Sequence, residues 1–335
     1  MKTKLIIFAV LVMALFGCEA GTTGQEVAIT SPYIGGTQGL DISFQDMRTE
    51  MFDQGDSIEP VIKIENRGEH TIPGGRTAIQ LAGINPAQFY ADANADNLKT
   101  VVGTELIATR KTPEGQVFAA PPILQPLSVM KYTATVPAPL DFPLRADICY
   151  DYQTNAVSKM CIRKDLLTPR AGGICEVTGS KPVFSSGAPI QVQNVQQNVR
   201  SANQIGISFD IVNVGGGNVY AKNSDCSRGR DYEDIVTADV DVGLTGAGVK
   251  CIGIGDSQGH SGEVRLFDNR KTIMCTVTVG GGQATDFEQL FTVKLDYEYE
   301  QSIATTLTVK KAGSLYDDDK STGKVQGEKT GYTGY

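Results

Sequence analysis

The 335-residue sequence predicts an all-β protein with two tandem β-sandwich domains. Apolar residues alternate with polar ones over several short segments, which is the pattern of a strand with one buried face. Two such segments recur 147 residues further along the chain, which indicates a duplicated module. No segment of ordinary helix length keeps an apolar period of about 3.6 residues. Many short strands with turn residues between them favour sandwiches.

The N-terminus predicts export. Lys2 and Lys4 precede an unbroken apolar run, Leu5–Phe16, which is shorter than the ~20 residues that a membrane-spanning helix needs. We therefore interpret residues 1–17 as a signal peptide. The alternative to a signal peptide is a buried N-terminal helix that belongs to the core.

The residue after this segment predicts a membrane anchor. Leu15-Phe16-Gly17-Cys18 resembles a lipobox, in which the cysteine is lipidated and becomes the mature N-terminus. The alternative is a plain signal peptide that is cleaved after Ala20. With a lipid on Cys18 the protein is extracellular and anchored at the cell surface, and residues 18–33 are a tether between membrane and fold.

Counting cysteines supports this interpretation. An odd number of cysteines in an exported protein leaves one thiol without a partner. If Cys18 carries lipid, six cysteines remain and all of them can pair. The seven are Cys18, Cys149, Cys161, Cys175, Cys226, Cys251 and Cys275.

The repeat is carried by two pairs of segments. Leu144–Tyr152 matches Phe291–Tyr299, with apolar residues facing apolar ones and two tyrosines facing two tyrosines. Ile62–Gly68 matches Phe209–Gly215 at the same offset, and each copy ends in Asn-x-Gly, a turn signal. One shared offset between two separated segments predicts a duplicated module.

The offset sets the expected domain bounds. We expect the first sandwich at 34–168, the second at 169–311, and a disordered tail at 312–335, where Gly, Lys, Thr and Asp dominate. A short helix is expected to begin at Pro86. Further strands are expected at Leu127–Val136, Ile235–Val242, Glu263–Phe267 and Ile273–Val279.

These features resemble a known class of repeat. An alternating strand, then Asn-x-Gly, then a closing hairpin near the domain end is similar to the CARDB-type and related immunoglobulin-like tandem repeats of prokaryotic, including archaeal, cell-surface proteins. The resemblance covers residues 34–311 and rests on short apolar motifs. It implies immunoglobulin-like sandwiches in an adhesive or structural setting and no catalytic residues.

Part of the disulfide pattern is predicted from spacing. Cys149 and Cys161 lie symmetrically about Asn155, so we expect them to pair across a hairpin whose loop is residues 154–156. The four cysteines Cys175, Cys226, Cys251 and Cys275 are then expected to pair among themselves, in one of three ways.

One motif suggests a metal. Asp92, Asn94 and Asp96 space oxygen ligands as a calcium loop does. The rest of that pattern fails, because its sixth position is Asn97 and its twelfth is Gly103. Two interpretations therefore stay open: a Ca²⁺ site and a solvated polar loop without a bound ion. No other cofactor is expected.

A second motif suggests catalysis. Gly255–Gly259 matches G-x-S-x-G, the nucleophile elbow of serine hydrolases, with Ser257 at its centre. No helix pattern follows it, His260 is too near in sequence, and His70 carries no matching signature. We expect a polar hairpin loop there and no enzyme activity.

Charge and composition limit the classes of partner that the protein is expected to bind. The net charge is −8 and there is no basic run, which argues against a nucleic-acid partner. We expect a non-catalytic structural, adhesive or assembly role, with the membrane, envelope proteins or glycans as partners. The alternatives are an extracellular module that binds carbohydrate or a Ca²⁺-dependent ligand, which the absence of Trp weakens, and remotely a secreted hydrolase using Ser257.

Overall fold

The structure, a computed structural model, describes residues 31–168, 173–255, 259–280 and 285–313. Its regular structure is almost entirely antiparallel β-strand, which confirms the all-β prediction. The predicted short helix is present as α2 (Pro86–Phe89), capped by Asn85, and a 3₁₀ turn, η1 (Ala95–Leu98), follows it. Neither is long and apolar enough to cross a membrane.

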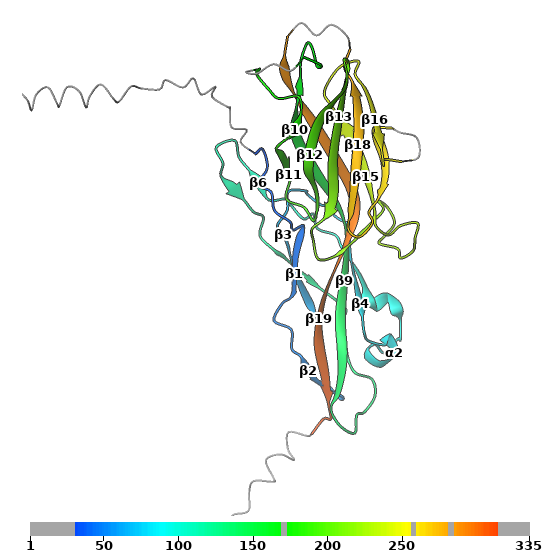
Figure 1. Ribbon diagram of the computed structural model, residues 1–335. Helices are drawn as coiled ribbons and strands as arrows, with labels where there is room; N and C mark the ends of the chain where they lie inside the picture. The colour runs from blue at the N-terminus through cyan, green and yellow to red at the C-terminus, as the bar shows by residue number, and fades with distance from the viewer. Residues whose placement is uncertain (1–30, 169–172, 256–258, 281–284, 314–335) are drawn as a thin grey trace, which may run out of the picture. The chain divides into compact units, whose positions relative to one another are not determined.

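Two long strands organise the fold. β9 (Leu140–Ile162) and β19 (Phe287–Lys310) run antiparallel side by side (Figure 1). Their register is unbroken from Leu140↔Val309 to Ile162↔Phe287. Alternate residues are buried along most of β9 and over Phe291–Tyr299 of β19, so the alternation in the sequence defines one apolar face on each.

The central sheet is built outward from this pair. Its order is β17-β15-β19-β9-β4-β5. On the outer side of each long strand lie two strands from the same half of the sequence. Each long strand also pairs with a short strand of the other half: β9 with β11, and β19 with β2, while β14 adds to β19 from its own half. The bounds are β17 (Ser261–Arg265), β15 (Ile235–Asp241), β4 (Thr77–Ala82), β5 (Lys99–Val102), β11 (Val183–Ser185), β14 (Asn218–Tyr220) and β2 (Glu50–Phe52).

Separate sheets from each half pack against the buried face. Phe209 in the C-terminal half meets Phe291 of β19 edge to face, with ring centroids 5.6 Å apart. The N-terminal half contributes β1 (Leu40–Phe44), β3 (Val61–Asn66) and β8 (Ile123–Pro126), in that order. The C-terminal half contributes β10 (Gly179–Ser180), β12 (Ile190–Ser201), β13 (Gln204–Asn213), β18 (Arg270–Thr278) and β16 (Gly248–Ile252). A two-stranded ribbon joins β6 (Arg110–Lys111) and β7 (Val117–Phe118).

Most predicted strands are confirmed, and one is wrong. β15, β17 and β18 cover the three strands expected in the second module. No strand lies at Leu127–Val136, where one was expected. The preceding strand, β8, ends at Pro126. Leu127, Met130 and Val136 are buried from an irregular segment, so their apolar character reflects burial without a pleated period.

The two halves repeat a specific contact at the offset of 147. Asn66 Oδ1 lies 3.3 Å from the hydroxyl of Tyr152, and Asn213 Oδ1 accepts a hydrogen bond from Tyr299 at 3.1 Å. Across the ladder, Tyr152 pairs with Tyr297 and Tyr150 with Tyr299, around the central pair Asp151↔Glu298. Such reciprocal pairing is what two copies related by a two-fold axis produce.

The disulfide prediction is wrong. Cys149 pairs with Cys226, Cys161 with Cys175, and Cys251 with Cys275. Residues 154–156 form no turn, because they lie inside β9. Two residues twelve apart on one strand are separated by about 40 Å, at ~3.3 Å per residue, far beyond disulfide reach. The cysteines expected to pair only among themselves therefore supply partners for Cys149 and Cys161.

Candidate functional site

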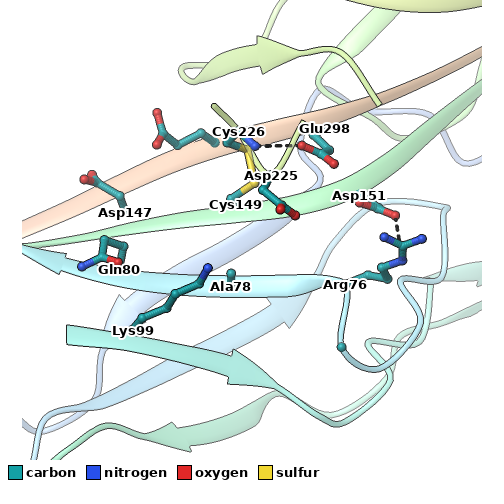
Figure 2. Close-up of a pocket in the computed structure, with 12 residues that line it drawn as sticks. Arg76, Ala78, Gln80, Lys99, Asp147, Cys149, Asp151, Asp225, Cys226 and Glu298 are labelled. Atoms are coloured by element: carbon teal, nitrogen blue, oxygen red, sulfur yellow. Dashed lines mark hydrogen bonds and ion pairs between the residues drawn. A yellow bond between two sulfur atoms is a disulfide. The ribbon is translucent and has the colours of Figure 1, made fainter. Parts of the chain in front are cut away.

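The candidate site is a polar recess on the outward face of the central sheet (Figure 2). It encloses about 240 Å³ and lies over β4, β9 and β19 beside the Cys149–Cys226 disulfide. The lining residues are Gly75, Arg76, Ala78, Gln80, Lys99, Asp147, Cys149, Asp151, Asp225, Cys226, Glu298 and Glu300.

Strand register places the acidic side chains. Cys149 faces Glu300 across the β9–β19 ladder and Ala78 across the β9–β4 ladder. Two residues further along β9, Asp151 faces Glu298 across the same ladder. Because successive strand residues point to opposite faces, these residues face outward while Tyr150 and its neighbouring tyrosines fill the core.

A loop covers one side of the recess. Residues 221–234 connect β14 to β15, and the disulfide joins Cys226 in this loop to Cys149 on β9. Glu298 is only 2% exposed beneath the loop. Its Oε2 atom accepts hydrogen bonds from Ser224 Oγ and from the Cys226 backbone N–H, each at 2.8 Å. A buried carboxylate requires such partners, and hydrogen bonds to a charged group contribute about 1.5–3 kcal/mol each.

The other carboxylates also have local partners. Glu300 accepts a hydrogen bond from the Tyr220 hydroxyl at 3.1 Å. Asp147 accepts hydrogen bonds from Arg145 at 2.8 Å and Ser302 at 2.5 Å. The recess is thus built into the hydrogen bonding of both long strands.

The recess has a negative potential. Five carboxylates and two cations line it, a formal charge of −3. Burial raises the pKa of Asp151; Arg76, 3.4 Å away, opposes this rise, and the neighbouring Glu298 and Asp225 add to it. The arrangement therefore favours cationic groups over anionic ones.

One set of metal-type ligands is present in this recess. Among the described residues, Cys149, Cys226 and Glu298 are the group of His, Cys, Asp or Glu side chains close enough to share an ion. In the oxidised state the two sulfurs are bonded to each other, so neither is a thiolate ligand.

The residues predicted to hold calcium lie elsewhere, in the exposed turn between α2 and η1. Asp92 Oδ1 accepts hydrogen bonds from the Asn94 backbone and the Asn97 side chain, at 3.2 and 2.8 Å. Asn94 Oδ1 caps η1 through the Asp96 backbone N–H at 2.9 Å. These oxygens form local turns here, and Ca²⁺ binding at Asp92, Asn94 and Asp96 stays a prediction.

Two of the remaining sequence candidates cannot be placed. Ser257 and Cys18 lie outside the described residues. β16 ends at Ile252 and β17 begins at Ser261, so a strand follows the Ser257 loop, where a nucleophile elbow has a helix. His70 packs edge-on against Tyr152, with ring centroids 5.4 Å apart, and burial lowers its pKa.

Sequence reasoning missed the recess. The available signal was the acidic residues at alternate positions, out of phase with each tyrosine pair: Asp147 and Asp151 in one strand, Glu298 and Glu300 in the other. Alternation marks these residues as outward-facing, but only the register and the Cys149–Cys226 bond bring them to one place.

Comparisons with known proteins add little. No protein-family model and no curated protein matches the chain. A solved structure, the envelope protein VP37 from White Spot Syndrome Virus, is similar over 45% of this chain and 98% of its own, with 9% identity and a TM-score of 0.23. We draw no conclusion about fold or function from similarity at this level.

Proposed function

We propose that this protein is an exported, lipid-anchored cell-surface protein with a non-catalytic structural, adhesive or assembly role. In this proposal each half is an immunoglobulin-like sandwich of the CARDB-type kind, and the halves are fused into one stiff unit. The supporting observation is the unbroken β9–β19 ladder, in which both halves share both strands. A shared ladder resists bending between modules far better than a flexible linker does.

The disulfides support an extracellular location. Three disulfides in one chain are typical of oxidising compartments and rare in the cytosol. Two of them, Cys149–Cys226 and Cys161–Cys175, join a residue of the first half to a residue of the second and add covalent links to the hydrogen-bonded one. The apolar N-terminus and the lipobox-like Cys18 supply export and anchoring in this proposal. Its partners are then the membrane, through the lipid, and neighbouring envelope proteins or glycans.

The test is the intact mass of the mature protein in membrane and medium fractions, before and after reduction. We expect a membrane-bound form that begins at Cys18, carries a lipid mass and gains six hydrogens on reduction of its three disulfides. Cys18→Ser is expected to move the protein into the medium, and Thr22→Ser serves as the matched control that stays bound. An unlipidated native form found only in the medium would contradict the anchor.

A further inference from the structure

Cys149, Cys226 and Glu298 combine ligand atoms from three separate segments. The two Sγ atoms and a carboxylate oxygen all lie within 4.8 Å of one another. Cys149 comes from β9 in the N-terminal half, Glu298 from β19, and Cys226 from the loop that covers the recess (Figure 2). Cys226 is 8% exposed and Glu298 is 2% exposed, so the set is held in place by packing.

We propose that these three residues form a redox-gated metal site, which binds one Zn²⁺-class ion when the Cys149–Cys226 disulfide is reduced. Two thiolates and one carboxylate are a donor set for borderline and soft cations such as Zn²⁺, whereas Ca²⁺ and Mg²⁺ prefer oxygen ligands alone. The fourth position of a tetrahedral ion would face the 240 Å³ recess, which has room for water.

The gating step is thiol–disulfide exchange with a dithiol reductant. The Sγ–Sγ bond breaks, and two new S–H bonds form on Cys149 and Cys226. The dithiol supplies two electrons and two protons and becomes a disulfide itself. Metal binding then displaces the two thiol protons to solvent, because the thiolate is the ligand.

Glu298 is already oriented for this role. Both of its hydrogen bonds, from Ser224 Oγ and the Cys226 backbone N–H, reach Oε2. Its other oxygen, Oε1, accepts none of the hydrogen bonds that the structure describes for the covering loop. A carboxylate fixed through one oxygen presents the other to a metal, in the way that outer hydrogen bonds orient ligands in known sites.

The surroundings favour a cation and leave the Cys149–Cys226 bond accessible. Asp151, Asp225 and Glu300 line the same recess, so a dication offsets part of its negative charge. Cys149 is half-buried and borders the recess. Cys251 and Cys275 are fully buried, whereas Cys149–Cys226, like Cys161–Cys175, has one half-buried cysteine through which a reductant can reach the bond.

This inference goes beyond the proposed structural role. A bound ion would hold residues 221–234 on the sheet when the covalent bond is open. The loop would then be clamped in both redox states, by a disulfide in one and by a metal in the other.

The experiment uses the full chain, reduced with a dithiol that is then removed without air, and titrated with Co²⁺. We expect one Co²⁺ per reduced chain with thiolate-to-cobalt charge-transfer absorption, displaced by Zn²⁺, and no such absorption in the oxidised chain. Glu298→Gln should weaken binding at least about tenfold. The matched control is Glu300→Gln, a carboxylate of the same recess outside the ligand set, which removes the same charge and should weaken binding far less than Glu298→Gln does.

Two results would overturn the proposal. One is a reduced chain, folded by circular dichroism, that shows no thiolate absorption with Co²⁺. The other is equal metal affinity in Glu298→Gln and Glu300→Gln. A chain that unfolds on reduction would give this second result, because its exposed thiols would bind metal without regard to residue 298.

Discussion

Tyr152 and Tyr299 occupy matching positions in the two halves, and each stands over a glycine. A Cβ on Gly68 would lie 1.9 Å from the Tyr152 hydroxyl, and a Cβ on Gly215 would lie 2.2 Å from the Tyr299 hydroxyl. The Asn-x-Gly motif therefore does more than allow a turn. Its asparagine contacts the tyrosine hydroxyl, and its glycine leaves room for the ring.

Substitution of these glycines tests the repeated contact. Gly68→Ala and Gly215→Ala are each expected to lower the free energy of unfolding by about 1–3 kcal/mol, because an added methyl overpacks the site. Gly216→Ala is the matched control, since nothing lies within 4 Å of a Cβ there. Urea unfolding measures all three. Equal stability of the Gly215 and Gly216 variants would show that the close approach is not structural.

Two carboxyl groups give opposite pH dependence. Hydrogen bonds from the backbone N–H groups of Val136 and Ala312 lower the pKa of Asp53, so its contribution to stability is complete above the ordinary value of 3.8 and is lost as the pH falls through the lowered pKa. Burial raises the pKa of Asp151, so its ionisation costs stability as the pH rises from 3.8 through the raised pKa.

The two asparagine variants should therefore change the melting temperature in opposite directions. At pH 7, Asp53→Asn is expected to lower the melting temperature and Asp151→Asn to raise it. Both differences should shrink once the pH falls below the lowered pKa of Asp53, where both carboxyls are protonated in the folded and unfolded chains. Melting curves from acid to neutral pH check this, and a stabilising Asp53→Asn would refute the assignment.

At the scale of elements, the sequence predicted strands better than their connections. The period of two marks Leu144–Tyr152 and Phe291–Tyr299 as strands with a buried face. It does not show where this strand stops, because burial alternates on through residues 153–160 while polar Thr154 and Ser158 occupy buried positions. A hairpin was therefore predicted inside β9. The acidic recess was missed for the same reason, since it depends on which strand lies beside which.

The disulfides should differ in their effect on stability. Loop-closure entropy grows with the number of residues enclosed, which are 77 for Cys149–Cys226 and 14 for Cys161–Cys175. The entropy model gives about 4.5 kcal/mol for the first and about 3 kcal/mol for the second. We expect the Cys149→Ala/Cys226→Ala variant to lose more stability in urea unfolding than Cys161→Ala/Cys175→Ala does. The reverse order would mean that loop length does not decide the relative effect of these two bonds on stability.

At the scale of the whole molecule, the halves cannot be separated without breaking a strand. The sheet of the C-terminal half contains the end of β9, where Val183–Ser185 pairs with Ala156–Ser158. The sheet of the N-terminal half contains the end of β19, where Glu50–Phe52 pairs with Thr308–Lys310. Unfolding either half would leave the other with an unpaired long strand. We therefore expect the two modules to unfold as one cooperative unit, and the proposed role as a stiff surface element depends on this.

Differential scanning calorimetry of the full, oxidised chain tests that claim most directly. The account predicts one transition whose calorimetric and van't Hoff enthalpies agree, because the shared β9–β19 ladder couples the halves. Two resolved transitions, or a calorimetric enthalpy near twice the van't Hoff value, would show that the halves unfold independently and would contradict the account.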